Sequence, residues 1–170
     1  VSGNPKVLAP VKDASSANGG LKVLSGNLGK SVIKVSAVKP ENRVVEARAR
    51  VFHTQEGMLA AFKAGELTGD VIAVVRFQGP KSVGMPELHK LTPQLGILQD
   101  RGHKVALVTD GRMSGASGKI PAAIHMTPEA SDGGAIAKIR DGDLIRLDAN
   151  EGTLTFIGDE KEFFSRTPAT

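Results

Sequence analysis

Two continuous apolar runs, residues 71–77 and 105–109, constrain the fold more than any other feature of this sequence. Both consist almost wholly of Val, Ile, Leu and Ala, and such continuous runs are typical of strands buried on both faces. Residues 86–100, which lie between the two runs, place four Leu at helical spacing. A buried strand, a helix and a second buried strand predict a βαβ unit.

Short strands and turns fill most of the remaining sequence, because 20 Gly and nine Pro cut the chain into short segments. A second helix is predicted between Thr54, which suits an N-cap, and Gly65, which suits a stop. Residues 121–125 fit a helix as well as a strand. Strands, the last of them in antiparallel hairpins, are predicted at residues 32–38, 44–51, 136–139, 144–147 and 153–157. The predicted fold class is α/β, a mixed barrel-like domain of short strands flanked by about three helices.

The length of 170 residues is enough for one compact domain, which we expect at residues 21–170. Residues 1–20 are rich in Ser, Gly, Pro and Lys without a sustained period, so they predict a linker or an extended arm. The chain begins at Val1 rather than Met and has no secretion signal, and we expect a fragment of a cytoplasmic protein.

Composition excludes several classes of function. The chain has no Cys, which excludes disulfides, thiolate zinc sites and an iron–sulfur cluster held by this chain alone. Its longest apolar run is about five residues, whereas a bilayer requires about twenty, so no membrane contact is expected. The net charge of +4 comes from Lys and Arg scattered among 18 acids, which favours a small anionic metabolite over nucleic acid. The four His lack metal-ligand spacing, so they are predicted to be surface or packing residues.

The first buried run leads into a loop at residues 79–87 that combines Gly with polar residues. Glu87 ends this loop and directly follows Pro86. Its carboxylate fits the first turn of a helix, where it would interact favourably with the positive end of the helix dipole. It fits a metal ligand as well, and both interpretations stay open at this point.

The second buried run leads into a Gly-rich loop at residues 109–119. Ser114 and Ser117 offer hydroxyl groups, and Arg112 and Lys119 offer cationic contacts to an anion. A phosphate-binding P-loop is excluded, because Gly and Ser or Thr are missing from two required positions. A serine-hydrolase elbow around Ser114 is excluded, because neither flanking position carries the required Gly. The loop therefore fits a ligand site or a tight structural turn.

Several short motifs recur around these two loops. They are Gly-Asn-Leu at 26–28, Gly-Pro at 79–80, Gly-Met-Pro-Glu at 84–87, Thr-Asp-Gly-Arg-Met-Ser-Gly at 109–115, Thr-Pro-Glu-Ala at 127–130 and Ile-Arg-Asp-Gly-Asp at 139–143. Over residues 21–157 the sequence thereby resembles the carboxy-terminal domain of the dihydroxy-acid and 6-phosphogluconate dehydratase family. Residues 88–93 and 114–119 resemble the phosphogluconate branch, whereas residues 29–30 and 116–117 depart from the pattern of the dihydroxy-acid branch.

The resemblance implies a swivelling β/β/α barrel-like domain and a hydro-lyase that converts 6-phosphogluconate into 2-dehydro-3-deoxy-6-phosphogluconate through an enol. By the same resemblance, Glu87 is a Mg²⁺ ligand and Ser114 is the base that takes the proton from the carbon next to the carboxylate. Arg112, Ser117 and Lys119 are predicted contacts to the anionic groups of this sugar-acid phosphate. Because a serine is a very weak acid, Ser114 can act as a base only beside a cation that stabilises its alkoxide.

The partners that the resemblance implies lie outside this chain. An iron–sulfur cluster and the remaining metal ligands are expected in an absent amino-terminal domain of the same enzyme, so the isolated domain is expected to be inactive. A homodimer is expected as well. Two alternatives stay open: a dehydratase for another sugar acid or dihydroxy acid, and a non-catalytic binding module of the same fold.

Overall fold

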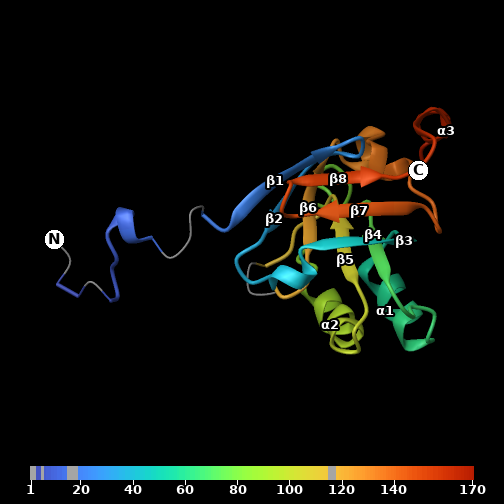
Figure 1. Cartoon of the computed structure of the whole chain (residues 1–170). Helices are drawn as coiled ribbons and strands as arrows, with labels where there is room; N and C mark the ends of the chain where they lie inside the picture. Colours follow the sequence, from blue (N-terminus) through green and yellow to red (C-terminus); the bar gives the residue numbers. More distant parts are fainter. Residues whose placement is uncertain (1–2, 5, 15–18, 115–117) are drawn as a thin grey trace.

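Eight strands close into a barrel in the order β1-β2-β6-β5-β4-β3-β7-β8 (Figure 1). The computed structural model describes residues 3–4, 6–14, 19–114 and 118–170. The strands are β1 (Leu21–Gly26), β2 (Gly29–Lys34), β3 (Val44–Phe52), β4 (Val71–Val75), β5 (Val105–Thr109), β6 (Ala122–Thr127), β7 (Leu144–Asp148) and β8 (Thr153–Phe156). The helices are α1 (Gln55–Lys63), α2 (Thr92–Asp100) and α3 (Glu160–Ser165). The predicted α/β barrel-like fold is confirmed.

Strands β3, β4, β5 and β6 form the parallel half of the barrel. All five residues of β4 and all five of β5 are buried, as the two continuous apolar runs predicted. In β4, Ile72 and Val74 join the core inside the barrel, whereas Val71, Ala73 and Val75 join a second core outside it. Since these strands are parallel, their carboxyl ends all open at one end of the barrel.

Helices α1 and α2 cover the outer face of the parallel half (Figure 1). The hydroxyl of Thr54 accepts a hydrogen bond from the backbone N–H of Gly57 at 3.0 Å, which confirms the predicted N-cap of α1. Helix α2 begins at Thr92, after a 3₁₀ turn at His89–Leu91, and so later than predicted. Glu87 precedes both, in an isolated parallel bridge with Arg112. The interpretation of Glu87 as a first-turn acid of a helix is therefore wrong.

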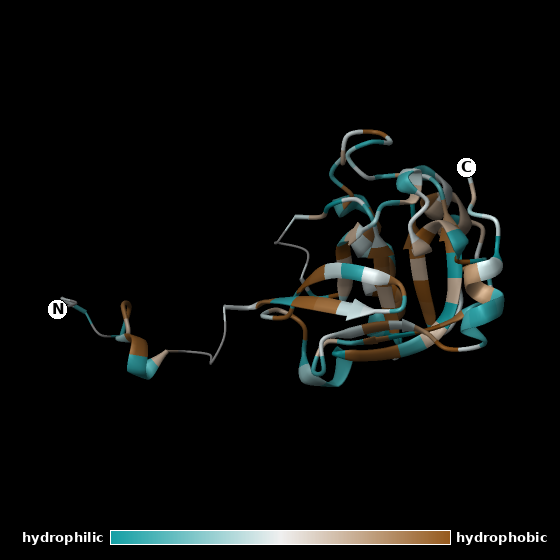
Figure 2. Cartoon of the chain, turned by 90° about the horizontal axis from the view of Figure 1, so that it is seen from above, coloured by the Kyte–Doolittle hydropathy of each residue, from teal (hydrophilic) through white to brown (hydrophobic). Residues whose placement is uncertain are grey.

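Strands β7, β8, β1 and β2 form the other half of the barrel, called the antiparallel half because it consists of two antiparallel hairpins, β1–β2 and β7–β8, each closed by a tight turn. The two hairpins meet through a short parallel pairing of β1 with β8. Residues in β8 alternate between half-buried and buried positions, as expected for strands with one face on the core. Figure 2 shows hydrophobic residues gathered along the barrel strands and hydrophilic ones on the outer segments. Helix α3 packs onto the barrel through the fully buried Phe163, and Arg166 fixes its end by pairing with Asp143 at 2.6 Å.

The structure contradicts one predicted strand and decides one segment for which helix and strand were both open. The predicted strand at residues 136–139 is wrong, because a 3₁₀ turn, Ala135–Lys138, occupies this position. The buried guanidinium of Arg76 donates to the carbonyls of Ile136, Ala137 and Ile139 at 3.3, 3.0 and 2.9 Å, so these carbonyls are used by a side chain and not by a neighbouring strand. The ambiguous residues 121–125 belong largely to strand β6.

The described residues before Leu21 are almost all exposed and include a single 3₁₀ turn, Val11–Asp13 (Figure 1). Their role as a linker or extended arm stays a prediction. Within the described part of the chain, no helix is both long enough and apolar enough to span a membrane.

Candidate functional site

The loops that follow β4 and β5 meet beyond the carboxyl ends of these strands. Glu87 of the first loop pairs with Arg112 of the second in a parallel bridge, and the N–H of Leu88 donates to the carbonyl of Arg112 at 3.2 Å. The two loops are therefore one structural unit, although 25 residues separate Glu87 from Arg112 in the sequence.

The carboxylate of Glu87 is the centre of this unit. Its Oε2 accepts a hydrogen bond from Nη1 of Arg112 at 2.7 Å, and its Oε1 accepts one from the backbone N–H of Ser114 at 2.5 Å. Arg112 is anchored further by a bond from its Nε to the carbonyl of Met85 at 2.8 Å. The structure thus brings together three of the predicted site residues: Glu87, Arg112 and Ser114.

Asp110 ties the second loop to two other segments, and the sequence did not single it out as a functional residue. Its carboxylate is buried and accepts hydrogen bonds from the backbone N–H groups of Phe77, Gln78 and Ala130 at 3.2, 2.9 and 2.9 Å. These donors lie beyond the ends of β4 and β6, so one carboxylate joins the ends of three parallel strands. Its sequence signals were its place between a buried strand and Gly111 and its place in the motif at 109–115.

Glu129, a second buried carboxylate, holds the first loop from the other side. Both of its oxygens accept from the backbone N–H of Lys81, at 3.1 and 3.2 Å. The Nζ of Lys81 forms an ion pair with Asp132 at 2.5 Å, and this hydrogen bond raises the pKa of the lysine above its usual value. Gly79 makes this arrangement possible, because a Cβ there would lie 2.2 Å from Oε2 of Glu129.

Two pockets lie against this unit. One, of about 460 Å³, is lined by the polar residues Asp110, Arg112, His125 and Glu129 together with Pro80, Met85 and others. The other, of about 380 Å³, has mainly apolar walls that include Met113, Val32 and Ile124, and it contains Ser114 and His125. An anionic ligand could reach Arg112 in the first pocket and Ser114 in the second.

Of the other predicted site residues, the structure places Lys119 outside this group. Lys119 forms an ion pair with Asp100 at the end of α2, at 2.5 Å, and both side chains are more than half exposed. Ser117 lies outside the described residues. Contacts of Lys119 and Ser117 with a substrate therefore stay predictions.

The site fits one ligand of a Mg²⁺ ion. Magnesium prefers oxygen ligands, and Glu87 supplies a carboxylate whose partner Arg112 is half exposed and so able to exchange. Within the described ranges, no group of three or more His, Cys, Asp or Glu could hold a metal ion. A complete metal site would need ligands from beyond these residues.

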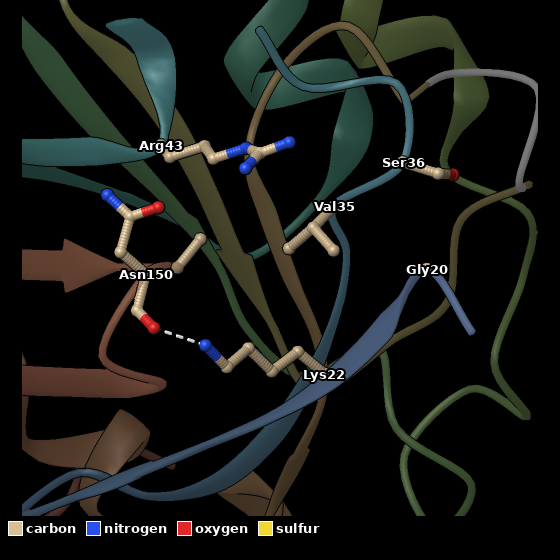
Figure 3. A pocket seen from close by; sticks show the side chains of 7 residues that line it. Gly20, Lys22, Val35, Ser36, Arg43 and Asn150 are labelled. Atoms are coloured by element: carbon tan, nitrogen blue, oxygen red, sulfur yellow. Dashed lines mark hydrogen bonds between the residues drawn. The ribbon is translucent and has the colours of Figure 1, made fainter. Parts of the chain in front are cut away.

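A further pocket, of about 420 Å³, lies at the opposite end of the barrel and has a basic rim (Figure 3). Two cations line it, but both already bind backbone carbonyls: Lys22 donates to Asn150, and Nε of Arg43 donates to Val38 at 3.2 Å. It contains none of the predicted site residues, so the candidate site is the one at the carboxyl ends of the parallel strands.

Comparison with known proteins finds relatives that cover almost the whole chain. Phosphogluconate dehydratase of Rhizobium meliloti (strain 1021) is 62% identical over 168 residues, which are 99% of this chain and 28% of the relative. Phosphogluconate dehydratase of Escherichia coli (strain K12) is 59% identical over 95% of this chain and 27% of the relative. Dihydroxy-acid dehydratase of Clostridium beijerinckii is 39% identical over 98% of this chain and 30% of the relative. The chain thus spans less than a third of the length of these relatives.

The family described as dihydroxy-acid/6-phosphogluconate dehydratase C-terminal matches residues 6–170. This match includes all eight strands and both site loops. The chain therefore belongs to the dihydroxy-acid/6-phosphogluconate dehydratase family, as its carboxy-terminal domain.

Proposed function

We propose that this chain supplies part of a split active site in a hydro-lyase that dehydrates 6-phosphogluconate to 2-dehydro-3-deoxy-6-phosphogluconate. One observation carries the proposal: Glu87 contacts the N–H of Ser114 and the side chain of Arg112 at the junction of the two loops. The identity of 62% to a phosphogluconate dehydratase, against 39% to a dihydroxy-acid dehydratase, favours the phosphorylated sugar acid as substrate.

In this proposal, Ser114 acts on the carbon next to the substrate's carboxylate. Its oxygen takes the proton from C2, the C2 electron pair forms the double bond to C3, and the hydroxyl on C3 leaves and is protonated to water. The resulting enol then gains a proton at C3 and loses the proton of its C2 hydroxyl, which gives the 2-keto product. A bound Mg²⁺ would supply Lewis acid chemistry to the alkoxide of Ser114 and the carboxylate of the substrate. An iron–sulfur cluster would supply it to the departing hydroxyl.

Glu87 and Arg112 would divide two further tasks. Glu87 would give one oxygen ligand to Mg²⁺, and in this proposal its carboxylate leaves Arg112 to do so. The guanidinium that is released is half exposed and suits a bidentate contact with the substrate's carboxylate or phosphate. Because the Ser114 N–H bonds to the same carboxylate, the proposed base stays next to the proposed metal ligand.

The rest of the proposal concerns partners. Ser117 and Lys119 are proposed as further contacts to the anionic substrate, and Lys119 would have to leave Asp100 to make one. The cluster and the other metal ligands are assigned to an amino-terminal domain, since this chain has no Cys. We also propose a cytoplasmic homodimer, and we expect this chain alone to show no turnover.

The test is the formation of the 2-keto product from 6-phosphogluconate by the full-length protein. Ser114→Ala is expected to lower kcat by about 10³-fold or more, and Glu87→Gln by about 10²-fold, because each removes a group that acts in proton transfer or its electrostatic support. The matched controls are Ser36→Ala and Glu41→Gln at the opposite end of the barrel, and both should retain wild-type kcat. A Ser114→Ala protein with unchanged kcat would refute the assigned base.

The same assay separates the alternatives. Turnover of an unphosphorylated sugar acid or a dihydroxy acid, without turnover of 6-phosphogluconate, would move the substrate to another branch of the family. A full-length protein that binds Mg²⁺ and 6-phosphogluconate but converts none of these acids would instead be a binding module.

A further inference from the structure

His125 stands out because its backbone lies in the left-handed region although it is part of a strand. Its φ is 55°, and Phe77 and Met85 are the other non-Gly residues with positive φ in the described part of the chain. Such backbone costs on the order of 1–3 kcal/mol per residue unless the surroundings impose it. Here the N–H of His125 donates to the carbonyl of Gly111 at 2.9 Å, which fixes this backbone to the loop that carries Arg112 and Ser114.

A β-bulge at this position turns the side chain of His125 out of the barrel. Strand β2 pairs Lys30 with Thr127 and Val32 with Ile124, so two steps along β2 match three steps along β6. The extra residue breaks the alternation of the strand, because Ala123 and then Met126 enter the inner core. Regular alternation would have buried His125 inside the barrel. The bulge leaves it exposed instead.

The exposed His125 lies between the two pockets of the candidate site. It lines the polar pocket with Arg112 and also lines the mainly apolar pocket with Ser114. Within the described part of the chain, its imidazole forms no hydrogen bond or ion pair. An imidazole offers both a donor and an acceptor, so it can bind a hydroxyl or a carboxylate oxygen. A ligand that spans the two pockets would therefore pass His125.

We infer that His125 is a substrate-contacting residue, which binds an oxygen of a sugar acid held between Ser114 and Arg112. This inference rests on the proposed function, since it assigns a contact in the same site. The competing explanation is that His occupies position 125 only because His, like Asn and Asp, tolerates left-handed backbone better than other non-Gly residues. That explanation assigns no role to the imidazole.

Two substitutions separate these explanations, because both suit left-handed backbone. His125→Gly removes the side chain at a φ that Gly adopts freely, and His125→Asn keeps a small group with a donor and an acceptor. In the full-length protein, His125→Gly should lower kcat/KM for 6-phosphogluconate by about 30-fold or more, with a raised KM, and Asn should restore part of this loss. The unfolding midpoint of the Gly variant should equal or exceed that of the wild type.

His103→Asn, in the turn after α2, should keep wild-type kcat/KM. If His125→Gly folds and keeps kcat/KM within about twofold of the wild type, the imidazole does not contact the substrate. If the Gly variant fails to fold, the Asn variant decides: wild-type kcat/KM and KM in that protein would overturn the inference.

Calorimetric titration with 6-phosphogluconate distinguishes failure of this inference from failure of the proposed function. A wild-type protein that binds 6-phosphogluconate, with a His125→Gly variant that binds it equally well, contradicts the inference alone. A wild-type protein that neither binds nor converts 6-phosphogluconate contradicts both. If the wild type converts another sugar acid, the same comparison on that acid decides the role of His125.

Discussion

The parallel and antiparallel halves of the barrel treat their strand ends differently. In the antiparallel half, two residues join β1 to β2, and a short turn joins β7 to β8. In the parallel half, the connections after β3, β4 and β5 must each return to the opposite end of the barrel, and long segments follow β4 and β5. These loops carry Glu87, Asp110, Arg112 and Ser114 of the candidate site. The candidate catalytic and binding residues thus lie mainly where the topology requires long connections.

The buried carboxylates of Asp110 and Asp148 allow this difference between the two halves to be measured as a difference in stability. Asp110 accepts N–H groups from three residues in two distant segments, whereas Asp148 in the antiparallel half accepts from its neighbours Asn150 and Glu151 at 3.0 and 2.9 Å. Asp110→Ala leaves three N–H donors without their acceptor, and we expect it to lower the free energy of unfolding by about 3–5 kcal/mol. Asp148→Ala should cost about 1–2 kcal/mol, since its local turn can open to water.

Urea unfolding of both variants checks this prediction. Equal losses would mean that the site end is no more interdependent than a hairpin turn. Because Asp110 precedes Gly111 and Arg112, its loss should also impair any activity of the full-length protein. Asp148→Ala should leave that activity intact.

The second prediction concerns the close approach at Gly79. A Cβ there would lie 2.2 Å from Oε2 and 3.0 Å from Cβ of Glu129, so Gly79→Ala should destabilise the chain by about 1–3 kcal/mol. The same change at Gly96 in α2 meets nothing within 4 Å and should stabilise the chain by about 0.5–1 kcal/mol, because Ala favours a helix. Thermal unfolding of the two variants should give shifts of opposite sign. A neutral Gly79→Ala would show that Glu129 can move away.

The sequence predicted the parallel half well and the site only in part. The runs that form β4 and β5 are apolar on both faces, and that pattern depends on local composition. The apolar segment at 136–139 fits a strand by its sequence. Its carbonyls instead accept hydrogen bonds from the distant Arg76, which the local sequence does not show. Asp110 and Glu129 were missed for the same reason: their function depends on N–H groups in other segments. No pattern local to a residue records such partners.

The third prediction concerns Asp148 in the antiparallel half and the pH dependence of the free energy of unfolding. Burial alone would raise the pKa of Asp148, but the backbone N–H of Glu151, the side chain of Arg146 and the N–H of Asn150 together lower it below its usual value. A carboxyl with a lowered folded-state pKa stabilises the protein above its unfolded pKa of about 3.9, and this stabilisation is lost as pH falls through the folded value.

Asp148→Asn should therefore weaken the loss of stability on acidification below about pH 4. Urea unfolding between about pH 3 and pH 7 measures this slope. Asp13→Asn, at an exposed position before Leu21, serves as the control and should leave the slope unchanged. A slope in Asp148→Asn equal to that of the wild type would show that these hydrogen bonds do not persist in solution.

The smallest effect is expected at Lys119. Its ion pair with Asp100 is more than half exposed on both sides, and such pairs contribute about 0–1 kcal/mol, so Lys119→Ala should change the free energy of unfolding by less than that. The variant also tests whether the site reaches this far along the second loop. If Lys119 contacts the substrate, the Lys119→Ala variant of the full-length protein should show a KM for 6-phosphogluconate about tenfold higher than the wild type. An unchanged KM would confine the anion contacts to the end of the barrel where Arg112 pairs with Glu87.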